Sequence, residues 1–134
     1  MTASPSIATA WLGRGLAFPV TPGERDHALA LVEGPEKVRQ SILTILDTEP
    51  GERVMRPSFG CGLRRFLMKP NSVATRALIA RDVELALVTW EPRVTVDAVE
   101  VLPGTDPALV LVAVAYRHLV DGRPDNLVYP LYLA

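Results

Sequence analysis

The side chains most able to do chemistry lie near the middle of the chain. Glu49 and Glu52 flank a Pro-Gly turn, and paired carboxylates are what glycosidases use. Cys61 follows, and its thiol with an imidazole from His27 or His118 would make a nucleophile and its base. However, glutamates beside a turn are usually solvated, and a lone cysteine between glycines is usually a small packing residue. The residues alone therefore give only weak support for an enzyme.

Cofactor and metal sites have no better support. Gly60-Cys61-Gly62 is too short to cradle a phosphate, and the Lys-Ser/Thr ending of such loops is missing. One cysteine and two histidines are too few soft ligands for a structural zinc site, and one cysteine cannot form an internal disulfide. We therefore expect no cofactor and no metal.

Basic side chains gather in the same part of the chain, at Arg53, Arg56, Arg64, Arg65 and Lys69. One interpretation is a solvated surface. The other is a docking surface for an acidic partner, because the rigid guanidinium group matches carboxylates. Nucleic acid is disfavoured, since 14 basic and 15 acidic residues give a net charge of −1 and phosphate binding needs a basic excess.

Glu91-Pro92-Arg93 forms a corner between an expected helix and an expected strand. Proline cannot continue a helix and restricts the residue before it, so the two charges are held on a stiff scaffold. They either pair internally or face a partner, and spacing alone does not decide. If they face a partner, replacing either by alanine should cost little stability, because solvated ion pairs contribute about 0–1 kcal/mol.

The length of 134 residues predicts one domain, and 49% hydrophobic with 22% charged residues is typical of a globular chain. Residues 1–14 are expected to form a loose arm and residues 15–134 the folded domain. No window is long and apolar enough to span a membrane, and the start does not resemble a secretory signal, so a cytoplasmic product is expected.

Periodicity predicts two strands, a helix, a short helical turn, a second helix and three strands. The first strands are expected at 15–20 and 28–33, and a helix begins at Pro35 and stops at Pro50-Gly51. Leu63 to Met68 is expected to form the short turn. The second helix is capped by Asn71 or Ser72 and has its main apolar face at Val73, Ala80, Val83, Leu87 and Trp90. Leu78 and Leu85 lie almost opposite, which predicts a helix covered on more than one side.

Period-two alternation begins after Arg93. Residues 109–116 are almost continuously apolar, as in a central strand buried on both faces. Residues 127–133 close the chain as a strand, and Pro130 assigns that strand to a sheet edge. The predicted fold class is α+β: a single small domain with two main helices packed on a mostly antiparallel sheet and a C-terminal three-strand meander.

The closing strand is a candidate assembly site, because an open edge can accept a strand from another chain. Alternation puts Leu127, Tyr129, Leu131 and Leu133 on one face and Val128, Pro130 and Tyr132 on the other. We expect one set to pack on the helices and the other to be partly covered only after assembly.

Several separated motifs resemble the small baseplate wedge proteins of contractile tails. They are Gly15 to Pro19, Thr48 to Pro57 continuing through Phe59 to Leu63, Trp90 to Arg93, and Asn126 to Tyr132. They occur in the family's order and cover about residues 13–134. Members of this family, also called sheath initiators or lysozyme-like proteins, occur in phage tails, type VI secretion baseplates and extracellular injection systems.

The resemblance implies a structural protein present in several copies around a sixfold tail hub. It would tie wedge proteins to the first sheath ring, next to hub or inner tube proteins, after assembly in the bacterial cytoplasm. Glu91, Pro92 and Arg93 would contact wedge helices, and residues 127–133 would belong to the sheet that the sheath extends. We therefore take as partner-binding residues Glu91, Pro92, Arg93, Arg53, Arg56, Arg64, Arg65, Leu127, Tyr129 and Leu131.

The alternative is a peptidoglycan-cleaving enzyme, suggested only by the family's older name. No nucleic acid and no membrane insertion are expected. The isolated chain is expected to be a monomer or a weak oligomer, because no heptad stripe is present.

Overall fold

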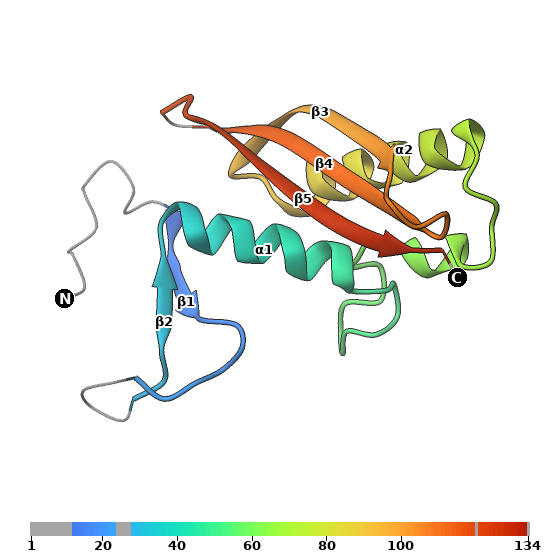
Figure 1. Ribbon diagram of the computed structural model, residues 1–134. Helices are drawn as coiled ribbons and strands as arrows, with labels where there is room; N and C mark the ends of the chain where they lie inside the picture. Colours follow the sequence, from blue (N-terminus) through green and yellow to red (C-terminus); the bar gives the residue numbers. More distant parts are fainter. Residues whose placement is uncertain (1–11, 24–27, 120, 134) are drawn as a thin grey trace. The chain divides into compact units, whose positions relative to one another are not determined.

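The computed structural model describes residues 12–23, 28–119 and 121–133. Internal contacts divide the chain into two compact units, residues 1–42 and 43–134. The order of elements along the chain, two strands, a helix, a 3₁₀ turn, a second helix and three strands, confirms the predicted order (Figure 1). No helix in the described ranges has the length and hydropathy needed to cross a bilayer.

The first unit contains a short antiparallel hairpin. β1 (Arg14–Leu16) pairs with β2 (Leu31–Glu33), and an isolated bridge joins Pro22 to Leu29. Both strands are shorter than predicted, in part because Pro19 and Pro22 remove ladder donors. The expected arm at 1–14 lies mostly outside the described residues, and its last residue belongs to β1.

α1 (Pro35–Asp47) begins at the proline that the sequence indicates and ends before Pro50-Gly51. Gly34, before the helix, has φ of 69°, which a glycine adopts without strain. The apolar face of α1 is buried and consists of Val38, Ile42, Ile45 and Leu46.

In the second unit, a 3₁₀ turn, η2 (Leu63–Phe66), precedes α2 (Val73–Trp90). The Ser72 hydroxyl accepts a hydrogen bond from the Thr75 N–H at 3.2 Å, which is the predicted N-cap. The face of α2 that packs inward consists of Thr75, Ile79, Val83, Ala86 and Leu87.

Two expectations about α2 are wrong. Val73 is 75% exposed, because it lies in the first turn, away from the buried face. Leu78 and Leu85 are also more than half exposed, so the described part of the chain covers only one side of this helix.

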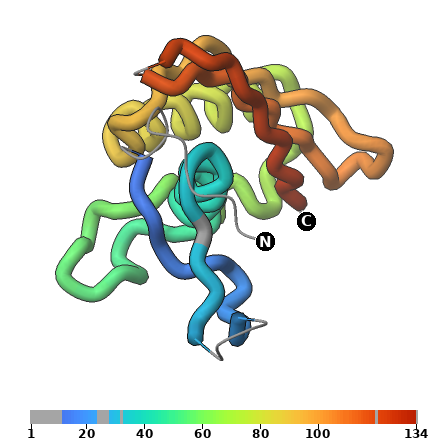
Figure 2. The backbone as a smooth tube through the Cα atoms, turned by 90° about the vertical axis from the view of Figure 1, so that its left-hand side faces the viewer, coloured from blue at the N-terminus to red at the C-terminus, as the bar shows by residue number. Residues whose placement is uncertain are grey.

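The three C-terminal strands form an antiparallel sheet of order β3-β4-β5, which confirms the α+β class and the predicted meander. They are β3 (Val94–Pro103), β4 (Leu109–His118) and β5 (Pro124–Tyr132), and β3 carries a bulge between Val96 and Ala98. α2 lies along one face of this sheet and contacts β3 (Figures 1 and 2). At the end of α1, the Asp47 carboxylate accepts a hydrogen bond from the Tyr129 hydroxyl of β5 at 2.5 Å.

β4 is the central strand, as predicted, but only one of its faces is fully buried. Val110, Val112, Val114 and Tyr116 are at most 1% exposed. The alternate residues, from Leu109 to Arg117, are half-buried or exposed. The apolar run therefore predicted a second covering layer that the described part of the chain does not supply.

Candidate partner-binding surfaces

The loop at residues 48–62, here called the signature loop, contains the two glutamates that suggested a glycosidase pair. The Glu49 carboxylate accepts the Arg64 N–H at 2.9 Å, and the Glu52 carboxylate accepts the Glu49 N–H at 3.0 Å. The Arg64 guanidinium also lies 3.2 Å from Glu52. Both carboxylates are therefore used as acceptors that fix the loop and the start of η2.

Gly60 closes this loop where no other residue fits. Its φ is 126°, and a Cβ added there would lie 2.3 Å from the carbonyl oxygen of Thr48. The same oxygen accepts the Cys61 N–H at 3.0 Å, which ties the end of the loop to its beginning. The two ends of the signature loop are thus held in direct contact.

Cys61 is not placed as a nucleophile. Its side chain is buried, and burial, reinforced by Asp82 and Glu49, raises the pKa of the thiol to about 12. His27 lies outside the described residues. His118 is buried on β4, where its contacts are with Tyr116 and Asp125. The thiolate form that catalysis needs is therefore disfavoured at neutral pH.

The basic cluster is divided among separate contacts. The Arg53 guanidinium lies 4.5 Å above the centre of the Phe59 ring, Arg64 pairs with Glu52, and Arg65 pairs with Asp82. Arg56 is exposed and makes no ion pair with the described residues. Partner contacts of these four arginines stay predictions, and Arg56 has the guanidinium most available for them.

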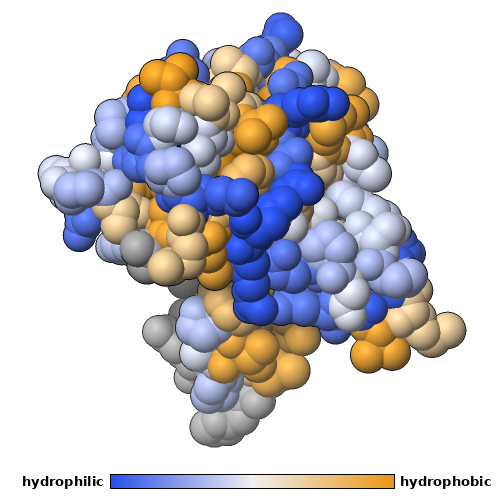
Figure 3. Space-filling view, turned by 90° about the vertical axis from the view of Figure 1, so that its right-hand side faces the viewer, coloured by the Kyte–Doolittle hydropathy of each residue, from blue (hydrophilic) through white to orange (hydrophobic). Residues whose placement is uncertain are grey.

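Figure 3 views the side on which η2 and the start of α2 lie, where hydrophilic side chains form a band between hydrophobic patches.

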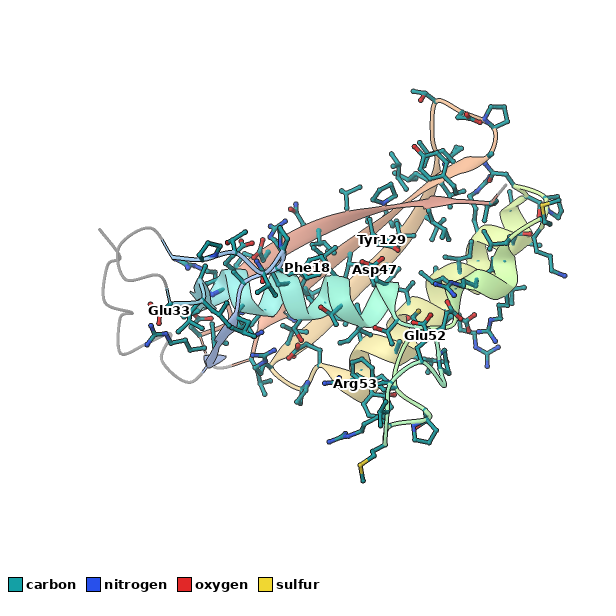
Figure 4. The ribbon with its side chains drawn as sticks, turned by 90° about the horizontal axis from the view of Figure 1, so that it is seen from below. Phe18, Glu33, Asp47, Glu52, Arg53 and Tyr129 are labelled. Carbon is teal, nitrogen blue, oxygen red and sulfur yellow. The ribbon has the colours of Figure 1, made fainter. Side chains whose placement is uncertain are left out.

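The tip of the signature loop is apolar, which the sequence analysis missed. Val54 and Met55 are 86% and 92% exposed, and Met55 has φ of 63°, a conformation uncommon for a residue with a side chain. Arg53 and Glu52, labelled in Figure 4, lie next to this tip. The signal was present in the sequence as two apolar residues between Arg53 and Arg56.

Glu91 and Arg93 pair with each other. The Arg93 Nε and Nη2 donate to the two carboxylate oxygens of Glu91 at 2.6 and 2.8 Å, and Glu91 is 1% exposed. This hydrogen bonding raises the pKa of the Arg93 guanidinium. The Pro92 corner turns the chain so that the two side chains meet, which is the internal pairing of the two alternatives. Contacts of Glu91, Pro92 and Arg93 with a partner stay predictions.

An aromatic contact joins this corner to the signature loop. The Phe59 and Trp90 rings meet edge to face, with centroids 5.2 Å apart. Beside them is an open groove of about 460 Å³, lined from the loop by Ser58, Gly60 and Cys61 and from α2 by residues including Leu85 and Thr89. The two motifs, far apart in sequence, thus form one continuous part of the second unit.

On β5, the side chains expected to bind a partner face inward. Leu127 is 3% exposed, Leu131 is half-buried, and the Tyr129 hydroxyl donates to Asp47 (Figure 4). Burial and the Asp47 carboxylate raise the pKa of Tyr129. The exposed set is the alternate one, with Val128 at 58% and Tyr132 at 56%. The sequence established that the sets alternate but not which of them faces the helices.

Hydrogen bonds at both ends of β5 show which backbone groups point away from β4. His118 N–H donates to Arg123 at 3.0 Å and Leu133 N–H donates to Ala108 at 2.7 Å. Bonded and non-bonded pairs alternate in an antiparallel ladder. The bonds at both ends therefore show that the backbone N–H and C=O groups of the odd-numbered residues of β5 bond to β4. Those of the even-numbered residues point to the outer edge.

This outer edge has few donors left. Proline occupies positions 124 and 130, and the Asn126 N–H donates to the Asp125 carboxylate at 2.8 Å. Val128 and Tyr132 keep outward N–H groups that no acceptor in the described ranges takes. The edge can therefore pair with an added strand mainly at its C-terminal half.

The hairpin of the first unit is another exposed apolar surface that the sequence analysis missed. Phe18, labelled in Figure 4, is 79% exposed. Four further apolar side chains on the hairpin are between 47% and 59% exposed: Leu16, Val20, Leu29 and Leu31.

Comparison with known proteins gives a consistent set of relatives. Residues 32–122 match the model of the family described as baseplate wedge protein gp25. The chain is 32% identical over 94 residues to baseplate wedge protein gp25 of Enterobacteria phage T4, covering 70% of each protein. It is 33% identical over 96 residues to baseplate protein W of Escherichia phage P2, covering 72% of this chain and 83% of that protein.

Two solved structures are similar over most of the chain. A protein of Geobacter sulfurreducens described as a putative tail lysozyme is 38% identical, with a TM-score of 0.73, over 80% of this chain and 97% of that one. A chain of the anti-feeding prophage baseplate is 27% identical, with a TM-score of 0.70, over 96% of this chain and 92% of that one.

Proposed function

Because the chain belongs to the gp25 baseplate wedge protein family, we propose that it ties wedge proteins to the first sheath ring, with the outer edge of β5 as the template. It is a baseplate wedge component of a contractile tail system, like its relatives in phages T4 and P2 and in the anti-feeding prophage. The proposal concerns what each surface does there.

The outer edge of β5 carries the proposal. Val128 and Tyr132 offer outward N–H groups, and the strand has no neighbour on that side among the described residues. An open edge of this kind pairs with an extended segment through main-chain hydrogen bonds. Pro130 leaves a gap in the donors, so the incoming strand must match a defined register. A sheath arm that pairs here would start an ordered ring.

The wedge side of the molecule would be the signature loop and the corner next to it. Val54, Met55 and Arg56 project from a loop that Glu49, Glu52 and Gly60 hold rigid. Pro92 is exposed at the corner that the Phe59–Trp90 contact joins to this loop, while Glu91 acts by keeping Arg93 in place. Several copies of the chain would repeat this contact around the hub, with hub or inner tube proteins nearby, after assembly in the bacterial cytoplasm.

We propose in addition that the chain is not an enzyme. The support is that the Glu49 carboxylate accepts the Arg64 N–H of η2 and the Glu52 carboxylate accepts the Glu49 N–H, so both serve as structural acceptors. The test is an assay of the purified chain on peptidoglycan, with Glu49→Gln and Glu52→Gln as controls. Hydrolysis that either substitution removes would contradict the proposal.

The substitution Val128→Pro tests the template. It removes one outward N–H from β5 and leaves the bonds to β4 in place, and β5 already accommodates proline at two positions of the same parity. The matched control is Val101→Pro. β3 is the other edge strand, and the bond from the Gly104 N–H to the Leu109 carbonyl fixes its alternation. By this alternation, the backbone N–H of Val101 points away from β4, as that of Val128 does.

Electron microscopy of particles should show Val128→Pro baseplates with bare tubes and Val101→Pro baseplates with sheath. Both chains should keep their circular dichroism and melting behaviour. Sheath seated normally on Val128→Pro baseplates would overturn the proposal. Deleting residues 127–134 is a poorer test, because Leu127 and Leu133 are buried and their loss would damage the sheet.

A further inference from the structure

The outward face of the C-terminal sheet has a polar half and an apolar half. An antiparallel sheet with one open face usually carries polar residues there. Near the start of β3 this holds, because Thr95 and Asp97 are exposed and the Arg117 guanidinium lies 3.0 Å from the Asp97 carboxylate. This half behaves as an ordinary solvated surface and serves as an internal reference for the other.

The other half is apolar in every strand. Leu102, Leu111 and Pro130 lie in register across β3, β4 and β5, and Leu109 is paired with Tyr132. Leu102 is 49% exposed, and the other exposed members are Val128, Pro130 and Tyr132, while Leu109 and Leu111 are half-buried. We call these six residues the outer patch: Leu102, Leu109, Leu111, Val128, Pro130 and Tyr132. It contains no charge, although an open sheet face normally does.

We propose that the outer patch docks one short amphipathic helix of another baseplate protein, with a lysine or arginine beside its apolar stripe. The patch spans residues 128–132, about 13 Å at ~3.3 Å per residue, and three strands, about 10 Å at ~4.8 Å spacing. A helix is about 10 Å wide and rises 1.5 Å per residue, so about nine residues cover it. A strand added at the β5 edge would lie beside the patch and leave it open.

Charge selects the kind of helix. Glu100 lies on β3 opposite Ala113, on the same face of the sheet as the patch and next to it. Its side chain is exposed and makes no ion pair with any described residue. A basic side chain on the helix would pair with it at the rim of the contact. A second copy of this chain laid face to face would instead add a second uncompensated carboxylate, which disfavours self-association through this face.

The proposal rests on the proposed function only in that the partner belongs to the baseplate. Its test places the photocrosslinking amino acid p-benzoylphenylalanine at Leu102 in assembled particles. The matched control is the same probe at Thr95, on the same strand and the same face. We expect a crosslink from position 102 to one helical, lysine- or arginine-containing segment of another baseplate protein, at least tenfold above the yield from position 95.

Charge is tested in the same experiment. Glu100→Lys should lower the crosslink yield from position 102 severalfold, and Glu84→Lys, an exposed change on α2, should not. Crosslinks to a second copy of this chain, to an extended segment, or equally from both positions would overturn the proposal.

This result is separable from the template test. The crosslinking probe is at Leu102 on β3, whereas Val128→Pro removes an N–H at the edge of β5 and keeps an apolar side chain in the outer patch. Particles that bear sheath but give no crosslink from position 102 would overturn the helix and leave the proposed function intact. Sheath retained by Val128→Pro would overturn the template, whatever position 102 contacts.

Discussion

The signature loop with its neighbouring corner, and the outward side of the C-terminal sheet, use their residues in opposite ways. In the first region the charged side chains serve the chain itself, since Glu49 and Glu52 accept backbone N–H groups of η2 and of the loop, and Glu91 holds Arg93. In the second, uncharged residues leave backbone donors and apolar side chains open, at Val128 and Tyr132. Charged residues therefore stabilise the loop and the corner, and uncharged residues form the surface that is open to a partner.

Burial explains this difference. A carboxylate that is 1% exposed, such as Glu91, is stable only with its partners in place. An exposed strand edge has no such requirement until another chain arrives. Three substitutions and one hydrogen-exchange measurement test whether the two regions differ in this way.

The largest effect is expected for Glu91→Ala. It leaves the Arg93 guanidinium, whose side chain is only 24% exposed, without its carboxylate. Loss of one partner of a buried pair costs about 3–5 kcal/mol of unfolding free energy, measurable by urea denaturation. The control is Asp97→Ala, which breaks an exposed pair with Arg117 and should cost less than about 1 kcal/mol. Equally small losses of unfolding free energy in both variants would show that the Glu91–Arg93 pair does not stabilise the fold and would favour a partner-binding role for Glu91.

Gly60→Ala should come next. Its Cβ would overlap the Thr48 carbonyl at 2.3 Å, and its φ of 126° is strained for alanine, so the loop closure must open. We expect a loss of about 3 kcal/mol. Gly51→Ala is the matched control, because its φ is 94° but nothing lies within 4 Å of the added Cβ. Strain alone predicts about 1 kcal/mol there, and equal losses at both positions would mean that the contact with Thr48 does not matter.

The smallest effect is expected for His118→Leu. Both ring nitrogens of this buried histidine lack a hydrogen-bond partner among the described residues, and the Asp125 carboxylate is 3.8 Å away. Replacing an unsatisfied buried polar group by an apolar one of similar size should leave thermal stability unchanged or raise it by up to about 1 kcal/mol. A clear loss of stability would show that His118 contributes a polar contact.

The sequence predicted most of the fold because local rules dominate it. Pro35 correctly indicated a helix start, Ser72 a helix cap and Pro130 an edge strand. The errors at α2 and at β4 have one cause. An apolar pattern indicates that a surface is to be covered, and it does not indicate whether this chain or another covers it.

The candidate site was less predictable from sequence. Glu91 and Arg93 were recognised as a corner, but their pairing depends on how Pro92 turns the chain, which spacing does not encode. Which face of β5 is exposed depends on tertiary packing, such as the contact of Tyr129 with Asp47, and not on the alternation itself. Residue parity narrowed the choice to two sets, and the structure selected Val128 and Tyr132 as the open one.

Residue-resolved hydrogen exchange distinguishes an open β5 edge from one that is paired with a sheath strand. In the free chain, the Val128 and Tyr132 amides should exchange rapidly, while those of Leu127 and Tyr129, which point toward β4, should be protected. In sheathed particles, we expect the exchange of the Val128 and Tyr132 amides to slow by about 100-fold or more, while the Leu127 and Tyr129 amides stay unchanged. Equal exchange of Val128 and Tyr132 in free chain and sheathed particle would contradict it.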